Sequence, residues 1–357
     1  MVKKISIVLI ICAIVIGKGF AEESKPLVNI SGVGYFDWKK DIQKSDGTEC
    51  ENTFELNRVY LNFTKQFDEI WSMRVTTDIG QVESESTKAY QEETAASSEV
   101  TSKTNNYTVY LKFAYIQAAL QYDYITYTLQ FGMVGTPLLN YVDNQSDYRW
   151  VQQNYFDNAK DLINTTIDYS ADLGARADVS LFKVVTITTA VTNGEGFKHV
   201  SETDDGKAYY VMSTLMLPEN VSIIAFNRYC VADDNDREDN YTNNSAFGVF
   251  YTHDILKVGA VYALPIQVIE GAKTRYRIVD GYVHMDGFNA GIVPIIVVGR
   301  FGYGKNIDSS ISTKIYSGGI GYRFSKDIRA TMYYQHKKDD SKSIADKSFY
   351  IKCGISF

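Results

Sequence analysis

The sequence is poor in cysteine and proline, with 4 cysteines and 5 prolines in 357 residues. Three of the cysteines, Cys50, Cys230 and Cys353, follow the N-terminal segment described below. They are odd in number and show no Cys-x-x-Cys spacing, so neither a metal site nor a disulfide framework is predicted. One disulfide, between Cys50 and Cys230, remains open because both residues are expected near the same end of the predicted strands.

Long apolar runs are scarce. After residue 21 no segment approaches the ~20 apolar residues that a transmembrane helix needs. The one apolar run, 5–16, follows Lys3 and Lys4 and is closed by Gly19-Phe20-Ala21. A short basic head, an apolar stretch and small residues before the cut predict a secretory signal peptide over residues 1–21. Residues 22–357 are then expected to form the mature chain as a single domain.

An excess of basic residues is also missing. The chain has 36 basic and 43 acidic side chains, and residues 1–21 contribute three of the lysines and no acid. A protein that binds nucleic acid presents a basic face. This charge balance therefore excludes nucleic acid as an expected partner.

Aromatic residues, in contrast, are abundant, with 27 tyrosines and 18 phenylalanines. Export, many aromatics and modest hydropathy suit a membrane barrel, whose strands alternate lipid-facing and water-facing residues. A soluble exported β-sandwich is the alternative. Both classes predict an all-β chain, so the strands themselves must discriminate between them.

Several segments alternate strictly between apolar and polar residues, as a strand with one apolar and one polar face does. In 69–81, for example, Trp71, Met73 and Val75 fall on one face. Arg74 lies mid-strand on the other face, as Arg176 does further along, which favours a barrel with an aqueous interior over a sandwich. Sixteen strands are predicted: 27–38, 53–66, 69–81, 106–120, 124–136, 165–182, 184–193, 207–218, 221–232, 244–253, 256–267, 276–289, 292–304, 311–323, 327–337 and 347–357.

The connections between these segments alternate between short and long. Bacterial outer-membrane barrels have short periplasmic turns and longer external loops. The sequence therefore predicts a transmembrane antiparallel β-barrel of sixteen strands, with fourteen or eighteen as alternatives. Outer-membrane lipid is then a partner, and a barrel of sixteen strands leaves an open aqueous channel.

The last predicted strand supplies an independent signal. Apolar residues alternate from Phe349 to the terminal Phe357. An alternating final strand that ends in an aromatic residue resembles the assembly signal of outer-membrane barrels. We therefore expect the barrel assembly machinery of the bacterial cell to recognise Phe357.

Four short stretches resemble the phosphate-selective porins of the O and P type. They are 54–61 (FELNRVYL), 111–117 (LKFAYIQ) together with 131–137 (FGMVGTP), 193–196 (NGEG) and 297–303 (VVGRFGY). In the first stretch Arg58 matches the second arginine of the family's pair, whereas Asn57 replaces the first. The resemblance implies a homotrimer whose lumen is narrowed by an inward-folded third loop, here 137–164.

The predicted function is that of a porin, which passes small hydrophilic solutes and ions passively and has no catalytic, metal or cofactor site. An anion-selective or phosphate-selective channel is the first alternative, and an outer-membrane adhesin or barrel enzyme that acts through its external loops is the second. An anion filter needs a cluster of basic groups, and loop 137–164 departs from one because acids dominate it. Its charged residues, which would form the constriction, are Asp143, Asp147, Arg149, Asp157, Lys160 and Asp161.

The wall opposite this loop is expected to carry pore-lining charges. Either the arginines form a positive track that faces the acids of the loop, or each arginine pairs locally with an acid of the wall. The sequence does not decide between the two. The residues are Arg58, Arg74, Asp78, Arg176, Asp178, Arg300, Arg323 and Arg329.

Overall fold

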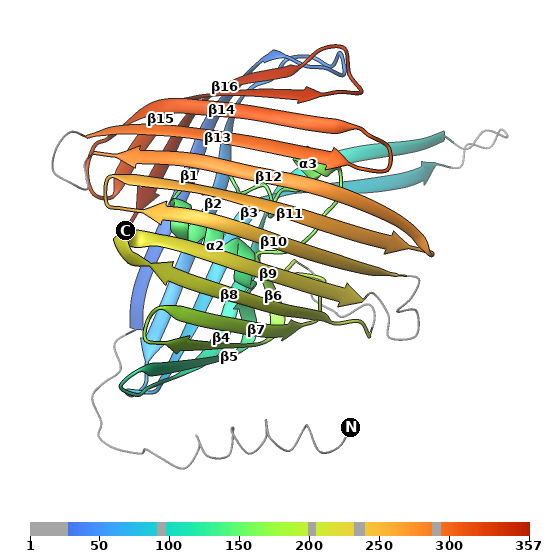
Figure 1. The fold of residues 1–357 in the computed structure, drawn as a ribbon. Helices are drawn as coiled ribbons and strands as arrows, with labels where there is room; N and C mark the ends of the chain where they lie inside the picture. The colour runs from blue at the N-terminus through green and yellow to red at the C-terminus, as the bar shows by residue number, and fades with distance from the viewer. Residues whose placement is uncertain (1–27, 91–97, 199–204, 232–239, 288–293) are drawn as a thin grey trace.

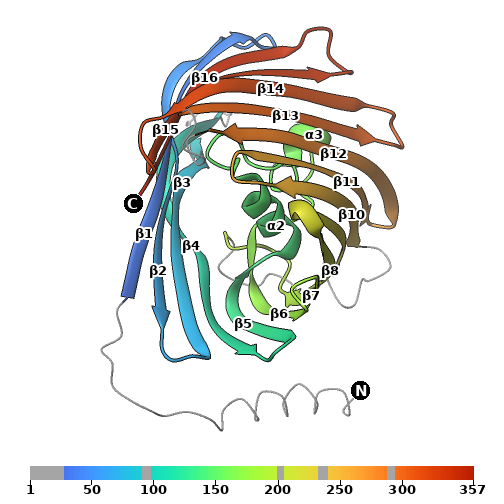
Figure 2. The same cartoon turned by 60° about the vertical axis from the view of Figure 1, so that its left-hand side comes forward.

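The computed structural model describes residues 28–90, 98–198, 205–231, 240–287 and 294–357. Sixteen strands form one closed antiparallel barrel, in which each strand pairs with its neighbours in sequence and β1 closes the ring against β16 (Figures 1 and 2). The prediction of a closed antiparallel barrel with sixteen strands is confirmed. The predicted signal peptide, residues 1–21, lies outside the described residues.

The strands agree with the predicted segments to within a few residues in most cases. Their bounds are β1 Val28–Gln43, β2 Asn52–Gln66, β3 Trp71–Tyr90, β4 Ser98–Gln121, β5 Ile125–Gly135, β6 Ala171–Leu181, β7 Val185–Thr192, β8 Ala208–Leu217, β9 Val221–Val231, β10 Tyr241–Thr252, β11 Leu256–Ile269, β12 Ala272–Asp286, β13 Ile295–Asn306, β14 Ser312–Arg323, β15 Ile328–Asp339 and β16 Asp346–Ser356.

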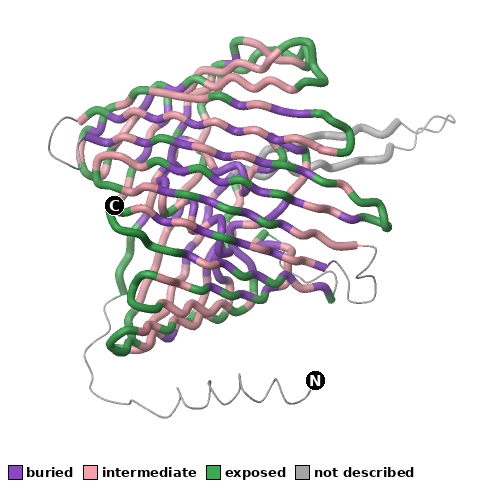
Figure 3. Tube along the Cα trace, viewed as in Figure 1, coloured by how far each residue is buried: buried purple, intermediate pink, exposed green. Residues whose placement is uncertain are grey.

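Alternation in the sequence becomes alternation of burial along the strands. Buried residues alternate with more exposed ones on the strands of Figure 3, because successive side chains of a strand point to opposite faces of the sheet. In β5 the side chain of Phe131 points outward and is 69% exposed. Its cross-strand neighbour Ile116 on β4 is also exposed. The outer surface is thus apolar, as a surface that faces lipid must be.

The barrel closes next to the C-terminus. Gly32 and Phe357 exchange two backbone hydrogen bonds, of 2.9 and 3.0 Å. A β-carbon at position 32 would collide with the ring of Phe357. Glycine at this position therefore lets the terminal ring pack directly against the backbone of β1.

The two rims of the barrel differ. The connections after odd-numbered strands lie at one end, here called the loop rim, and those after even-numbered strands lie at the other end, the turn rim. Three differences from the predicted connections stand out. The hairpin of β3 and β4 extends well beyond the predicted strand ends, 81 and 106. The predicted long loop 268–275 is the two-residue turn Glu270-Gly271, which is tight because both residues adopt positive φ, 49° and 75°. The third difference concerns the connection of β12, which ends at Asp286, to β13, which begins at Ile295; the short turn predicted there, 290–291, lies outside the described residues.

The predicted strand 165–182 is wrong at its start, since β6 begins at Ala171. Residues 136–170 instead form a long connection that lies inside the ring of strands and contains α2 (Pro137–Ser146) and α3 (Lys160–Ile163) (Figure 2). Ile167, inside the predicted strand, belongs instead to an apolar core formed by this connection. We call residues 136–170 the inner loop. No helix of the described residues is long and apolar enough to cross a membrane.

Candidate permeation path

The inner loop is held in the barrel by an apolar core. Leu139, Trp150 and Phe156 are at most 1% exposed, and they pack against inward-facing apolar side chains of the wall. Those wall residues include Phe250 on β10 and Ile278 on β12. The core runs over the inner faces of β7–β15, which we call the covered wall. The barrel interior is therefore filled along this side.

Buried ion pairs add directional contacts to the core. Arg300 on β13 and Asp280 on β12 are both almost fully buried, and the Nε atom of Arg300 donates to Asp280 at 2.8 Å. The same carboxylate accepts a hydrogen bond from the backbone N–H of Tyr155, at 3.2 Å. Arg300 also donates to the carbonyl of Gln152 in the loop, at 3.4 Å. The pair thus fixes the loop as well as the wall.

A second anchor lies where the inner loop meets β8–β10. Arg228 on β9 is buried, pairs with Asp168 at 3.3 Å and donates to the carbonyl of Ile167 at 3.2 Å. The hydroxyl of Tyr210 donates to Asp168 at 3.1 Å. Burial raises the pKa of the Asp168 carboxyl to about 6, against the opposing effect of Arg228. This end of the loop is thus tied down by an acid that titrates close to neutrality.

The C-terminal end of α2 carries a third anchor. Arg329 on β15 holds Asp147 by two hydrogen bonds, of 2.9 and 3.2 Å, and its guanidinium lies 4.5 Å from the ring of Trp150. Burial raises the pKa of Asp147, but the charge and hydrogen bonds of Arg329 outweigh it and lower the pKa to about 2. Asp147 adopts the left-handed conformation that ends the helix, with φ 47°. His284 on β12 binds the adjoining carbonyl of Ser146 through Nδ1, at 3.0 Å.

Arg149 connects the inner loop to β2 on the opposite wall. Its guanidinium bridges Asp143 and Asp157 of the loop, and its Nε atom donates to the hydroxyl of Tyr60 at 3.2 Å. The amine of Lys112 on β4 donates to the same hydroxyl at 3.1 Å. This group of five residues, the central cluster, places loop acids and a wall lysine around one tyrosine hydroxyl inside the barrel.

The apolar core includes no described side chain of β2–β6, and we call the inner faces of these strands the open wall. Polar groups line it: Gln130 donates to Gln117 at 2.8 Å, and Arg176 pairs with Asp178 at 3.0 Å. Arg74 donates to Asn62 at 3.0 Å. The open wall is therefore the polar and charged side of the lumen.

All six wall arginines named from the sequence lie on the inner face of the barrel, and five form ion pairs. Four of these pairs join two wall residues, whereas Arg329 binds Asp147 of the inner loop. The pairs are Arg58–Asp78, Arg176–Asp178, Arg300–Asp280, Arg323–Asp286 and Arg329–Asp147. Arg74 pairs with no carboxylate among the described side chains; it binds Asn62 and Thr76 and lies 4.7 Å from the ring of Phe113.

The loop acids are paired too. Asp143 and Asp157 bind Arg149, Asp147 binds Arg329, and Asp161 binds Lys337 of β15 at 3.0 Å. Lys160 lines two cavities near the loop rim. The acidic residues of the loop are therefore largely neutralised rather than free.

Sequence reasoning missed the partners that decide these pairings. Asp280 and Asp286 were not singled out because the pairs depend on the register between strands, which no local pattern reveals. Lys112 was missed although it lies inside the quoted stretch 111–117. Its alternation with the outward-facing Leu111 could have placed it on the inner face.

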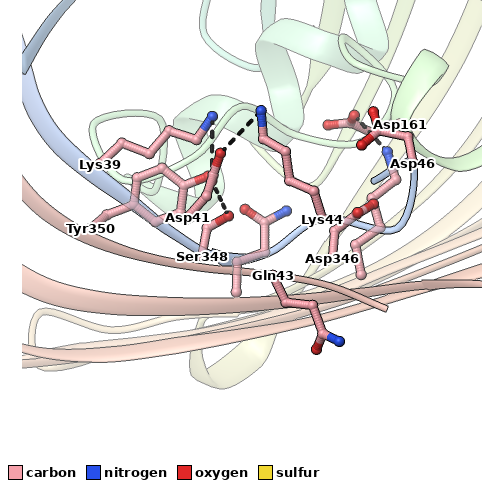
Figure 4. A pocket seen from close by; sticks show the side chains of 11 residues that line it. Lys39, Asp41, Gln43, Lys44, Asp46, Asp161, Asp346, Ser348 and Tyr350 are labelled. Atoms are coloured by element: carbon pink, nitrogen blue, oxygen red, sulfur yellow. Dashed lines mark hydrogen bonds and ion pairs between the residues drawn. The ribbon is translucent and has the colours of Figure 1, made fainter. Parts of the chain in front are cut away.

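A cavity of about 290 Å³ opens at the loop rim beside the first hairpin (Figure 4). Lys39 and Lys44 lie 3.5 and 3.4 Å from Asp41, which also accepts a hydrogen bond from Ser348 at 2.7 Å. Asp161 of the inner loop lines the far side of this cavity. A solute that enters at this rim therefore encounters both positively and negatively charged side chains.

Cys50, Cys230 and Cys353 form no disulfide, so the Cys50–Cys230 bond is not made.

Solved structures with the same fold come from outer membranes. The outer-membrane channel DcaP of Acinetobacter baumannii is 14% identical with a TM-score of 0.61, over 95% of this chain and 99% of that one. An anion-selective porin from Comamonas acidovorans is 8% identical with a TM-score of 0.64, over 93% and 100% of the two chains. OmpT of Vibrio cholerae, in its trimer form, is 10% identical with a TM-score of 0.59, over 94% and 100%. These likenesses establish the porin-type barrel fold.

No family model matches the sequence, and neither does any curated protein. The resemblance to phosphate-selective porins of the O and P type is therefore supported only as far as a porin fold.

Proposed function

We propose that this protein is a porin of the bacterial outer membrane, through which small hydrophilic solutes and ions diffuse passively. The observation that carries the proposal is the division of the lumen. The inner loop covers one side with an apolar core, whereas the open wall keeps charged and polar side chains such as Arg74, Gln117 and Arg176. A polar interior within an apolar exterior is the arrangement of a water-filled barrel.

The same proposal includes the surroundings of the barrel. The loop rim faces outward and the turn rim, with both chain ends, faces the periplasm, as in other outer-membrane barrels. The mature chain begins after Ala21, its terminal Phe357 is recognised by the barrel assembly machinery, and the functional unit is a homotrimer. The channel performs no catalysis.

An anion preference is the second candidate, and one observation favours it. Among the described side chains no carboxylate lies within 4.0 Å of the charged groups of Lys112 or Arg74, whereas the loop acids already have cationic partners. Two cations without carboxylate partners on the open wall attract anions into an aqueous lumen with low-dielectric walls.

Planar-bilayer recording tests both candidates. Residues 22–357 are refolded, inserted into a bilayer and recorded under a KCl gradient. Discrete, long-lived conductance steps support the porin, and the sign of the reversal potential reports the preferred ion. A correctly folded barrel that gives no conductance would refute the proposal and shift attention to the loops at the loop rim.

A further inference from the structure

A second cavity, of about 200 Å³, lies between the open wall and the inner loop. Arg58 of β2, Gly80 of β3 and Tyr110 of β4 line its wall side. Gln153 of the inner loop and Lys198, after β7, line the opposite side. The cavity therefore borders the central cluster, and a solute that follows the open wall passes it.

Two cationic groups face the cavity, Arg58 from the wall and Lys198 from the opposite side. Lys198 has no carboxylate within 4.0 Å among the described side chains, and its amine lies 5.5 Å from the centre of the Tyr110 ring. Arg58 binds Asp78 through Nη1 alone, so its remaining N–H groups have no acceptor among the described residues. A guanidinium with spare donors next to an ammonium suits a carboxylate ligand.

Two carboxylates adjoin these cations: Glu55, which lines the cavity, and Asp78, which lies next to Gly80 and binds Arg58. Asp78 is fully buried, and its Oδ1 atom accepts no hydrogen bond from the described residues. That oxygen lies 4.0 Å from the position of a β-carbon on Gly80, the residue that lines the cavity. Glu55, which also lines the cavity, is engaged through one oxygen by Thr53, at 3.1 Å. A buried acceptor without a donor is costly, and a ligand that donates to it relieves the cost.

The charges in the cavity and next to it balance. Arg58 and Lys198 supply donors, and Glu55 and the adjoining Asp78 supply acceptors, so a ligand with a single charge would leave one of these two kinds of group without a partner. A neutral molecule that carries both charges pairs with both kinds. The volume admits a small amino acid but not a disaccharide. We propose that this cavity binds a small zwitterion of the α-amino-acid class during its passage, an inference that rests on the proposed porin function for its access route.

The test uses L-alanine and two analogues that each lack one charged group, propionate and ethylamine. Saturation-transfer NMR is recorded with the refolded protein in detergent micelles, with each compound at the same concentration. L-alanine is expected to give a signal about 10-fold or more above either analogue, because a site built for two charged groups rejects a ligand that lacks one. Equal signals for the three compounds would overturn the proposal.

Variants locate the site. Lys198→Gln changes an exposed side chain and should reduce the L-alanine signal to the level of ethylamine. Asp78→Asn should reduce it to the level of propionate. Lys337→Gln removes a lumen lysine of the loop rim and should leave the signal unchanged. An unchanged signal in Lys198→Gln would assign the binding to another place and contradict the proposal.

Bilayer recording of the same sample separates this inference from the porin itself. Conductance without preferential binding of L-alanine would support the porin function and contradict the binding site. Preferential binding of L-alanine without conductance would support the binding site and contradict the porin function.

Discussion

The covered wall and the open wall are built from the same kind of strand, yet their inward-facing residues differ. On the covered wall, Ile278 and Ile296 point inward and are fully buried by the inner loop. On the open wall, inward positions hold Arg74 and Gln117. Alternation alone specifies which face points inward, whereas the chemistry of that face specifies whether protein or water covers it. Apolar residues on the inner face therefore mark where the loop docks.

The largest effect is expected from loosening the covered wall. Phe156→Ala removes a fully buried ring from the loop core and should cost about 3–5 kcal/mol of packing free energy. The loop then leaves the wall for part of the time, and the single-channel conductance should become larger and noisier. Phe131→Ala is the control, because that ring lies on the outer surface. Identical recordings for both variants would mean that the loop core does not limit the lumen.

The buried ion pair on the covered wall should matter almost as much. Asp280→Asn leaves the guanidinium of Arg300 buried without a carboxylate, which costs about 3–5 kcal/mol. Denaturant unfolding in lipid vesicles should show a clear loss of stability. Asp308→Asn is the control: it breaks an exposed ion pair between Arg275 of β12 and residue 308, just after β13. This change should cause no measurable loss of stability. Equal losses would show that burial does not set the strength of these pairs.

A smaller effect is expected at the boundary between the two walls. Arg149→Gln leaves Asp143 and Asp157 without their shared cation. The reversal potential in a KCl gradient should shift towards cation preference, by a few-fold in permeability ratio. Arg176→Gln, on the open wall next to Asp178, should shift the potential in the same direction but less, since it exposes one acid rather than two. A shift towards anions in Arg149→Gln would contradict a place for the central cluster on the permeation path.

The smallest effect concerns pH. The pKa of Asp168 is raised to about 6, above the value of about 3.9 for an unfolded chain. The folded state therefore binds the proton more readily, and stability should rise by about 1 kcal/mol as pH falls from about 7 to about 5. Asp168→Asn should remove this rise. Asp147→Asn should retain it, because the pKa of Asp147, about 2, keeps that carboxyl charged over the whole range.

The sequence predicted most of the barrel because lipid and water impose a regular alternation on each strand. It failed where that constraint ends. The hairpin of β3 and β4 continues beyond the predicted ends, where the sequence is rich in Ser, Thr and Glu and the apolar alternation stops. Ile167 lies in the wrongly predicted start of the strand 165–182, and its apolar side chain serves the core of the inner loop instead.

The candidate site was predicted less completely for a different reason. The inward direction of Arg58 and Arg176 follows from alternation within one strand. The pairing of Arg300 with Asp280 can be inferred only from the register between β12 and β13. In that register Asp280 lies two residues from the position opposite Arg300. The contact between Arg149 and Tyr60 depends on how a long loop folds across the lumen, and no spacing in the sequence encodes it.

The central claim is that solutes pass along the open wall. Cysteine accessibility tests it directly, after Cys50, Cys230 and Cys353 are replaced by serine. A charged thiol reagent added to Gln117→Cys channels in a bilayer should reduce the current in discrete steps, whereas Ile278→Cys channels should be unaffected because the inner loop covers that position. Stepwise block at position 278 with none at position 117 would place the path on the other wall and contradict the account.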